Sequence, residues 1–217
     1  MSDRENHSTF DYQTPGEEIA NAITHGIGAL LSVAALVLLV VFSARKGDAW
    51  RVVSFSVYGA TLILLYTMSV LSHAFTGNVK RLFELFDFSA VYLLIAGTYT
   101  PIALVFMRGP WGWTIFGIIW ALAVLGVIFK VFFLGRFNFA GTLVYIAMGW
   151  LIIAAFKPLV AGSSAGFIKW LVAGGVCYTL GTFFYLFREM PYHHPVWHLF
   201  VLAGSMCHFF GFMFHGL

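Results

Sequence analysis

Seven long apolar runs, separated by short polar segments, constrain this chain more than any other feature. Each run is close to the roughly 20 apolar residues that an α-helix needs to cross the hydrocarbon core. Only helices and closed barrels satisfy their backbone hydrogen bonds in lipid, and continuous apolar runs lack the alternation of barrel strands. The sequence therefore predicts an all-α membrane protein, a seven-transmembrane helix bundle. The expected spans are about 19–43, 51–75, 84–107, 112–134, 138–157, 166–187 and 195–215.

Charge is too scarce for a soluble domain. The chain of 217 residues is 60% hydrophobic and 10% charged, whereas soluble domains carry about 25% charged residues. We expect a short polar tail over 1–18 and one transmembrane domain over 19–217. The basic residues are scattered over loops, which argues against a nucleic-acid partner. Membrane lipids are the expected partners.

Loop charge does not orient the bundle. Arg4, Lys80, Arg81, Lys130, Arg136 and Arg188 fall on the side of the N-terminus, and Arg45, Lys46, Arg51, Arg108, Lys157 and Lys169 fall on the other. The positive-inside rule therefore returns a tie.

Ionisable residues inside the spans are the main functional candidates, because burying them in lipid is expensive. His25 lies early in the first span and His73 late in the second. Asp87 lies early in the third span, and His194 and His198 lie at the start of the seventh. Because seven spans alternate in direction, all five residues are predicted to share one side of the membrane.

The spacing of His194 and His198 suits a shared metal ion. Two residues four apart lie on one helical face, which is the arrangement that lets two imidazoles bind one ion. Pro195 suits a first helical position, so we expect His194 to be the cap residue, with a slightly loosened pair geometry. The alternative is a histidine pair that only hydrogen-bonds loop carbonyls at a helix start.

His73 is the candidate third ligand. Three histidines and one water form the open tetrahedral arrangement of a catalytic zinc site. Asp87 is the candidate group that holds or deprotonates that water. Ser69 lies one turn before His73 and could hydrogen-bond a ligand or a developing oxyanion, or could satisfy itself against the preceding turn.

A polar stripe on the first span consists of Glu18, Asn21 and His25. Its spacings of three and four place these residues on one face. His25 could compete with His73 as a ligand, although we favour a supporting or structural role for all three. His208 lies about 21 Å along the helix from His194 and cannot share its metal.

These residues together resemble the hemolysin III-type bacterial proteins of the progestin and adipoQ receptor family, which includes the adiponectin receptors. The matching features are Glu18-x-x-Asn21-x-x-x-His25-Gly26, Ser69-x-x-x-His73, Asp87 with Tyr92 to Pro101, His194-x-x-x-His198 and Cys207-His208-Phe209. The resemblance covers about residue 16 to the end. It implies a seven-helix fold in the cell membrane with a cytoplasmic N-terminus. It also implies a zinc near the cytoplasmic side, held by His73, His194 and His198, with Asp87 at the zinc-bound water and Ser69 in support.

The leading hypothesis is a zinc-dependent intramembrane hydrolase of lipid amides or esters, since ceramide-type hydrolysis is associated with the receptor branch. A second hypothesis is a non-enzymatic receptor-like or regulatory protein of lipid homeostasis with a structural zinc. A third is a transporter or channel that uses His25 and His208 as relay groups. A pore-forming toxin fits worst.

Overall fold

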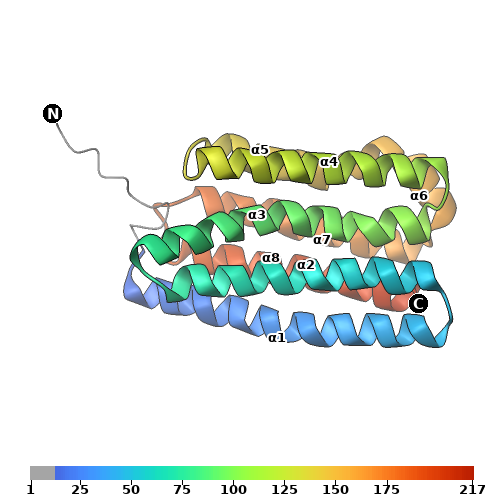
Figure 1. Ribbon diagram of the computed structural model, residues 1–217, viewed down its shortest axis with the longest axis horizontal. Coiled ribbons are helices and arrows are strands. Elements are labelled where there is room, and N and C mark those ends of the chain that lie inside the picture. Colours follow the sequence, from blue (N-terminus) through green and yellow to red (C-terminus); the bar gives the residue numbers. More distant parts are fainter. Residues whose placement is uncertain (1–12) are drawn as a thin grey trace.

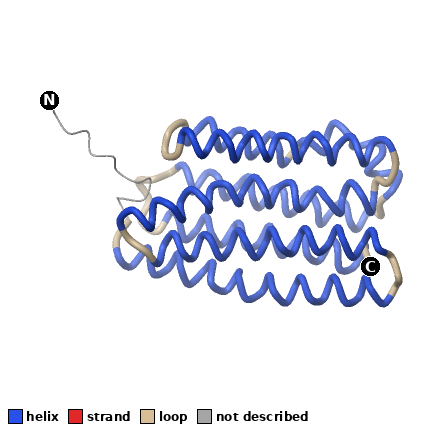
Figure 2. The backbone as a smooth tube through the Cα atoms, in the orientation of Figure 1, coloured by secondary structure: helices blue, strands red, loops and turns tan. Residues whose placement is uncertain are grey.

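The computed structural model describes residues 13–217, and within that range it is a bundle of helices without strands (Figures 1 and 2). Seven helical segments of this range are long and apolar enough to cross a membrane. The predicted seven-helix membrane fold is thereby confirmed. In chain order, the elements are α1 (Pro15–Arg45), α2 (Ala49–Ala74), α3 (Gly77–Pro101), the π-helical η1 (Ile102–Phe106), α4 (Pro110–Phe133), α5 (Asn138–Gly149), the 3₁₀-helical η2 (Leu151–Ala155), α6 (Phe156–Gly162), α7 (Ala165–Leu186) and α8 (His193–His215).

Several helices extend beyond the apolar runs that predicted them. Residues 1–12 of the expected polar tail over 1–18 lie outside the described residues. The last four residues of that tail belong to α1, which begins at Pro15. Thr14 caps this helix: its hydroxyl accepts from the Glu17 N–H at 3.3 Å, and the Glu17 carboxylate accepts from the Thr14 N–H at 2.8 Å. This reciprocal capping box starts the helix before the hydrocarbon begins. Hydropathy marks only the lipid-facing part of such a helix.

Successive long helices run antiparallel, and α3 is central to the bundle (Figure 1). Of the most apolar window of α3, 78% is buried, against 28% for α1. α1 packs on α2 and α8, α2 on α3, and α7 on α8. The alternation brings the starts of α1, α3 and α8 and the end of α2 to one end of the bundle, as predicted.

Two departures from regular α-helical geometry lie within the expected spans. α3 passes into π-helical geometry directly after Pro101, which lacks a backbone donor and so removes one bond of a regular helix. The fifth span breaks at Trp150, between α5 and η2. The Tyr99 hydroxyl donates to the Gly149 carbonyl at 2.8 Å and accepts from the Ile152 N–H at 2.8 Å. Tyr99 thus satisfies backbone groups that lipid could not.

Candidate metal centre

Three buried histidines converge at the end of the bundle where α1 begins. His73 comes from the last turn of α2, and His194 and His198 come from the first two turns of α8. Their candidate ligand atoms all lie within 4.8 Å of one another. The ring centroids are 5.2 Å apart for His73–His194, 5.2 Å for His73–His198 and 4.6 Å for His194–His198. This cluster could hold a metal ion.

The donor set fits a tetrahedral metal ion. Zn–N bonds of about 2.0–2.1 Å place tetrahedral ligand nitrogens about 3.4 Å apart. Since the candidate ligand nitrogens lie no more than 4.8 Å apart, no two of them need to approach each other by more than about 1.4 Å to reach that separation. Small rotations of imidazole rings supply movements of that size. Three imidazoles also leave a fourth position open.

Hydrogen bonds to α1 orient two of the three rings. His73 Nδ1 lies 2.7 Å from a carboxylate oxygen of Glu18. His198 Nδ1 lies 3.3 Å from the carbonyl of Asn21. Because carboxylates and carbonyls only accept, both Nδ1 atoms carry the proton and donate. The Nε2 lone pairs of both rings remain for a metal, which is how metal-binding histidines are usually held.

Two further contacts surround these rings. Asn21 Nδ2 also lies 3.4 Å from His73 Nδ1, but the shorter, charge-assisted bond to Glu18 dominates. Glu18 additionally pairs with Lys80. Thr24 Oγ1 lies 3.2 Å from His198 Nδ1. One face of α1 therefore supports the cluster, and it carries the predicted residues Glu18 and Asn21.

His25 is a fourth imidazole beside the cluster and is not one of its three converging members. Its ring stacks on His198, with centroids 3.4 Å apart and planes 9° apart. Tyr66 meets the same ring edge-on, with centroids 5.0 Å apart. Both His25 nitrogens are buried without a hydrogen-bond partner in residues 13–217. His25 thus packs against a candidate ligand.

Asp87 and Ser69 lie beside the cluster on the wall of a cavity. They line it together with His25, His194 and His198. The Ser72 hydroxyl donates to the Ser69 carbonyl at 2.8 Å and lies 3.5 Å from the Asp87 carboxylate. His73, which is held against α1, is not among the lining residues. The structure therefore brings every predicted site residue to one end of the bundle, with Asp87 facing the cavity.

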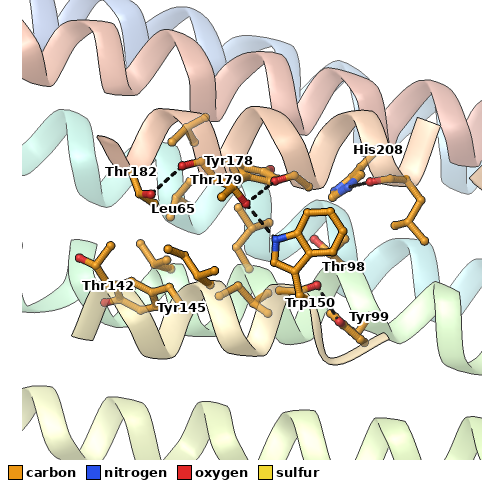
Figure 3. Close-up of a pocket in the computed structure, with 18 of the residues that line it drawn as sticks. Leu65, Thr98, Tyr99, Thr142, Tyr145, Trp150, Tyr178, Thr179, Thr182 and His208 are labelled. Atoms are coloured by element: carbon orange, nitrogen blue, oxygen red, sulfur yellow. Dashed lines mark hydrogen bonds between the residues drawn. The ribbon is translucent and has the colours of Figure 1, made fainter. Parts of the chain in front are cut away.

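The cavity extends from the histidines into the opposite half of the bundle and has a volume of about 290 Å³. This lies near the lower end of the roughly 300–1,000 Å³ of small-molecule sites. Figure 3 shows Trp150, at the break of the fifth span, reaching Thr179 of α7, and the indole N–H donates to that hydroxyl at 2.9 Å. Apolar side chains form most of the wall, including Leu65, Val91, Leu94, Ile95, Ile146 and Val172.

One local expectation about α8 was wrong. His194 is not a cap residue, because α8 begins at His193 and its cap is Tyr192, in left-handed geometry with φ 56°. Pro195 is tolerated in the first turn, where its missing N–H would have no helical partner. His194 and His198 therefore sit one full turn apart on a regular helix, both buried.

Sequence reasoning missed two buried charges near the site. Glu84 and Lys130 are each 1% exposed. We took Glu84 as a span boundary and Lys130 as a surface cation, but Lys130 is buried with its ammonium 4.7 Å from the centre of the Phe88 ring. The signals were available: Glu84 lies three residues before Asp87, and Lys130 lies inside an apolar run. Thr24 was also missed, and nothing in the sequence distinguishes it from a threonine bonded to its own helix.

Comparison with known proteins gives consistent matches along almost the whole chain. A sequence model described as haemolysin-III related matches residues 13–209. "Hemolysin-3" of Bacillus cereus is 52% identical over 202 residues, covering 93% of this chain and 92% of the relative. "Hemolysin-3 homolog" of Bacillus subtilis (strain 168) is 50% identical over 200 residues, covering 92% and 94%. The human "Monocyte to macrophage differentiation factor" is 26% identical over 204 residues, covering 89% and 82%.

Proposed function

Since this multi-pass membrane protein belongs to the haemolysin-III related family, we propose that it is a zinc-dependent intramembrane hydrolase of lipid amides or esters. The observation that carries the proposal is the junction of the histidine cluster with the cavity. His194 and His198 belong to both, and Asp87 and Ser69 lie on the same wall. A site that hydrolyses a lipid needs this union of a metal, a proton acceptor and an apolar compartment.

The donor chemistry favours zinc. His73, His194 and His198 would hold the ion through one nitrogen each, which is the ligand set of hydrolytic zinc sites with an open fourth position. Zinc, when bound, polarises a carbonyl and makes hydroxide available at neutral pH. Glu18 and the carbonyl of Asn21 keep two of the rings in the tautomer that this role requires.

The remaining residues handle the proton and the substrate. The Asp87 carboxylate accepts the proton from the attacking water and passes it to the departing amine or alcohol. The Ser72 hydroxyl, which donates to the Ser69 carbonyl at 2.8 Å, lies 3.5 Å from that carboxylate. The Ser69 hydroxyl donates a hydrogen bond to the substrate oxygen that gains charge. The apolar wall excludes bulk water and accommodates an acyl chain.

The substrate class follows from where the cavity lies. Its wall includes side chains of α5, η2 and α7, and it extends through the apolar part of the bundle. A lipid that already resides in the bilayer reaches such a site without crossing water. We therefore expect the scissile bond of a long-chain lipid amide or ester to lie at the histidine end, with the acyl chain along the cavity.

A structural zinc in a non-enzymatic receptor-like or regulatory protein is the second candidate. It is favoured by the connectivity of the cluster, because an ion there would join α2 to α8 around the supporting face of α1. The two candidates differ at Asp87. A structural zinc tolerates Asp87→Asn with full biological activity, whereas a hydrolase does not.

We propose the cell membrane as the location, with the N-terminus and the histidine cluster on the cytoplasmic side. Reporter fusions placed after Arg45 and after Phe75 test the orientation. A cytoplasmic reporter should be active only after Phe75, and the opposite result would invert the assignment.

The function is tested by incubating zinc-loaded protein with a lipid extract and following products by mass spectrometry. Wild type should release fatty acids from one lipid class. Asp87→Asn should retain zinc and lose at least about 100-fold in rate, the scale of general-base catalysis. Equal turnover by Asp87→Asn, or no zinc in the wild-type protein, would rule the proposal out.

A further inference from the structure

Glu17 is a buried carboxylate to which the hydrolytic proposal gives no role. It lies in the first turn of α1 and is 9% exposed. One of its oxygens accepts from the N–H of Thr14 at 2.8 Å and from the Thr14 hydroxyl at 3.0 Å. The other oxygen accepts from the backbone N–H of Tyr192 at 2.8 Å. A capping box needs only the first oxygen, so the bond to Tyr192 requires another explanation.

Tyr192 is the residue at which α8 starts, and its backbone geometry is unusual. It occupies the N-cap position in left-handed geometry, with φ 56°. Within residues 13–217, no side-chain hydrogen bond caps this helix. Left-handed geometry is uncommon for residues other than glycine and persists only where the surrounding structure holds it. Glu17 supplies such a contact, directly at the backbone of Tyr192.

The side chain of Tyr192 packs on the same turn of α1. A Cβ atom at Gly16 would lie 3.0 Å from the Tyr192 hydroxyl. That separation is too short for an ordinary contact, so a glycine at position 16 leaves room for the phenol. The backbone and the ring of Tyr192 therefore meet α1 at two adjacent residues, and the starts of the two helices are fastened together.

This fastening acts on the third candidate ligand. The rings of His73 and His198 are each held by a hydrogen bond to α1. His194 follows Tyr192 by two residues and lies in the first turn of α8. Its distance from the other two rings therefore depends on where the backbone of that first turn lies. A contact that fixes the start of α8 also fixes the backbone of His194.

We propose that Glu17 is the positioning residue of His194. Through the N–H of Tyr192 it holds the first turn of α8 so that the His194 ring reaches the other two imidazoles. This inference rests on the proposed function, because it takes the histidine cluster as a metal centre. Glu17 does not line the cavity, so it acts through the helix and not on the substrate. In this arrangement α1 positions all three ligands.

Three substitutions separate the bond to α8 from the cap of α1. Glu17→Ala removes both. Glu17→Gln keeps an amide oxygen that can accept from the N–H of Tyr192, and it is the conservative rescue. Thr14→Ala removes the capping hydroxyl and leaves the bond to Tyr192 in place. Thr14→Ala is thus the matched control for loss of the helix cap, and it should lower Tm without affecting the metal.

Cobalt(II) in place of zinc tests the ligand geometry, because its visible absorption depends on the number and arrangement of its ligands. Wild type, Thr14→Ala and Glu17→Gln should give one spectrum, and Glu17→Ala should give the spectrum of His194→Ala. Zinc affinity should fall by about 10- to 100-fold in Glu17→Ala, as for the loss of other outer partners of ligands. A wild-type spectrum in Glu17→Ala, or an altered one in Thr14→Ala, would overturn the positioning role.

Hydrogen exchange of the metal-free full chain tests the same contact without any metal. Residues 192–199 should exchange faster in Glu17→Ala than in wild type or Thr14→Ala, whereas residues 203–215 should be unchanged. Equal exchange of residues 192–199 in all three proteins would overturn the inference. Lipid hydrolysis by wild type together with that result would leave the hydrolase standing. Faster exchange in Glu17→Ala without any hydrolysis by wild type would support the role of Glu17 and remove the hydrolase.

Discussion

One end of the bundle and its middle bury polar side chains in different ways. At the end where α1 begins, His73, His194 and His198 come from two helices and direct nitrogens toward a common point. Deeper in the bundle, the Ser205 hydroxyl accepts from Tyr66 at 2.8 Å and lies 2.8 Å from the hydroxyl of Tyr178. Both groups join helices that are distant in sequence, but only the first is arranged around a point.

The difference shows what each group can do. Tyrosine and serine hydroxyls both donate and accept, so the Ser205 group satisfies its members by itself. At the histidine end, His73 and His198 donate through Nδ1 and present lone pairs through Nε2. Lone pairs that converge repel one another until a cation lies between them. The Ser205 group therefore stabilises the fold, and the histidine cluster is suited to bind an ion.

The largest expected effect is the loss of one of the converging nitrogens. Removal of an outer partner of a metal ligand costs about 10- to 100-fold in affinity, so His194→Ala should lower zinc affinity by more than about 100-fold. Metal analysis of purified protein measures this. The matched control is His193→Ala, whose ring bonds to the carbonyl of Phe184 at 3.1 Å instead. Equal zinc in His194→Ala and wild type would remove the distinction between the histidine cluster and the Ser205 group.

The next effect tests the support that α1 gives to the cluster. Glu18→Gln replaces the carboxylate that fixes the tautomer of His73, so zinc affinity should fall by about 10- to 100-fold. Competition with a chromogenic chelator measures the affinity. Glu189→Gln removes an exposed carboxylate elsewhere and should have no effect. An unchanged affinity in Glu18→Gln would mean that the ring is held by packing alone.

Part of the histidine cluster could be predicted from the sequence, because both the number of spans and the spacing of His194 and His198 can be recognised from periodic patterns. Seven alternating spans placed His73 and Asp87 at the same end as the α8 pair, and the structure has that arrangement. Helical periodicity also predicted that Glu18 and Asn21 share one face of α1. These features can be predicted because each depends only on the residue spacing within a single helix or on the direction in which that helix crosses the bundle.

Features that depend on contacts between helices could not be predicted. The break at Trp150 occurs within an ordinary apolar run and exists because Tyr99, from another helix, satisfies the freed backbone groups. Lys130 lies deep enough to be covered by Phe88, although hydropathy allowed a position near the surface. The contact of Thr24 with His198 depends on how α1 and α8 cross. Residue spacing along one helix contains none of this information.

A moderate effect on stability is expected from disrupting the Ser205 group. Ser205→Ala leaves the buried hydroxyls of Tyr66 and Tyr178 without their partner, which should lower the free energy of unfolding by about 1–2 kcal/mol. Thermal melts in detergent measure this as a lower Tm. Ser54→Ala is the control, because Ser54 is buried and its hydroxyl has no hydrogen-bond partner in residues 13–217. If Ser205→Ala lowered zinc affinity as well, the Ser205 group and the histidine cluster would be coupled and the comparison would fail.

The smallest effect concerns Asp48, at the turn between α1 and α2, far from the histidines. Its carboxylate caps α2 through the Trp50 N–H at 2.9 Å and accepts from Arg108 at 2.9 Å, and it also pairs with Arg51. Burial raises the pKa of Asp48. The backbone N–H of Arg51 and the charges of Arg108 and Arg51 lower that pKa by more than burial raises it, so it lies below its ordinary value of 3.8. Asp48→Asn keeps the cap and loses the charge, which should cost less than about 1 kcal/mol.

The stability difference between wild type and Asp48→Asn should depend on pH in a defined direction. A carboxylate whose pKa is lowered on folding contributes its full stability above the ordinary value of 3.8 and loses it as the pH falls through the lowered pKa. The Tm gap between wild type and Asp48→Asn should therefore be constant near neutral pH and close below about pH 4. High salt at neutral pH should narrow it too, because Arg108 is half exposed. A gap that persists in acid would show that the amide disturbs the cap, and a change in zinc content would show that this turn is not independent of the metal end.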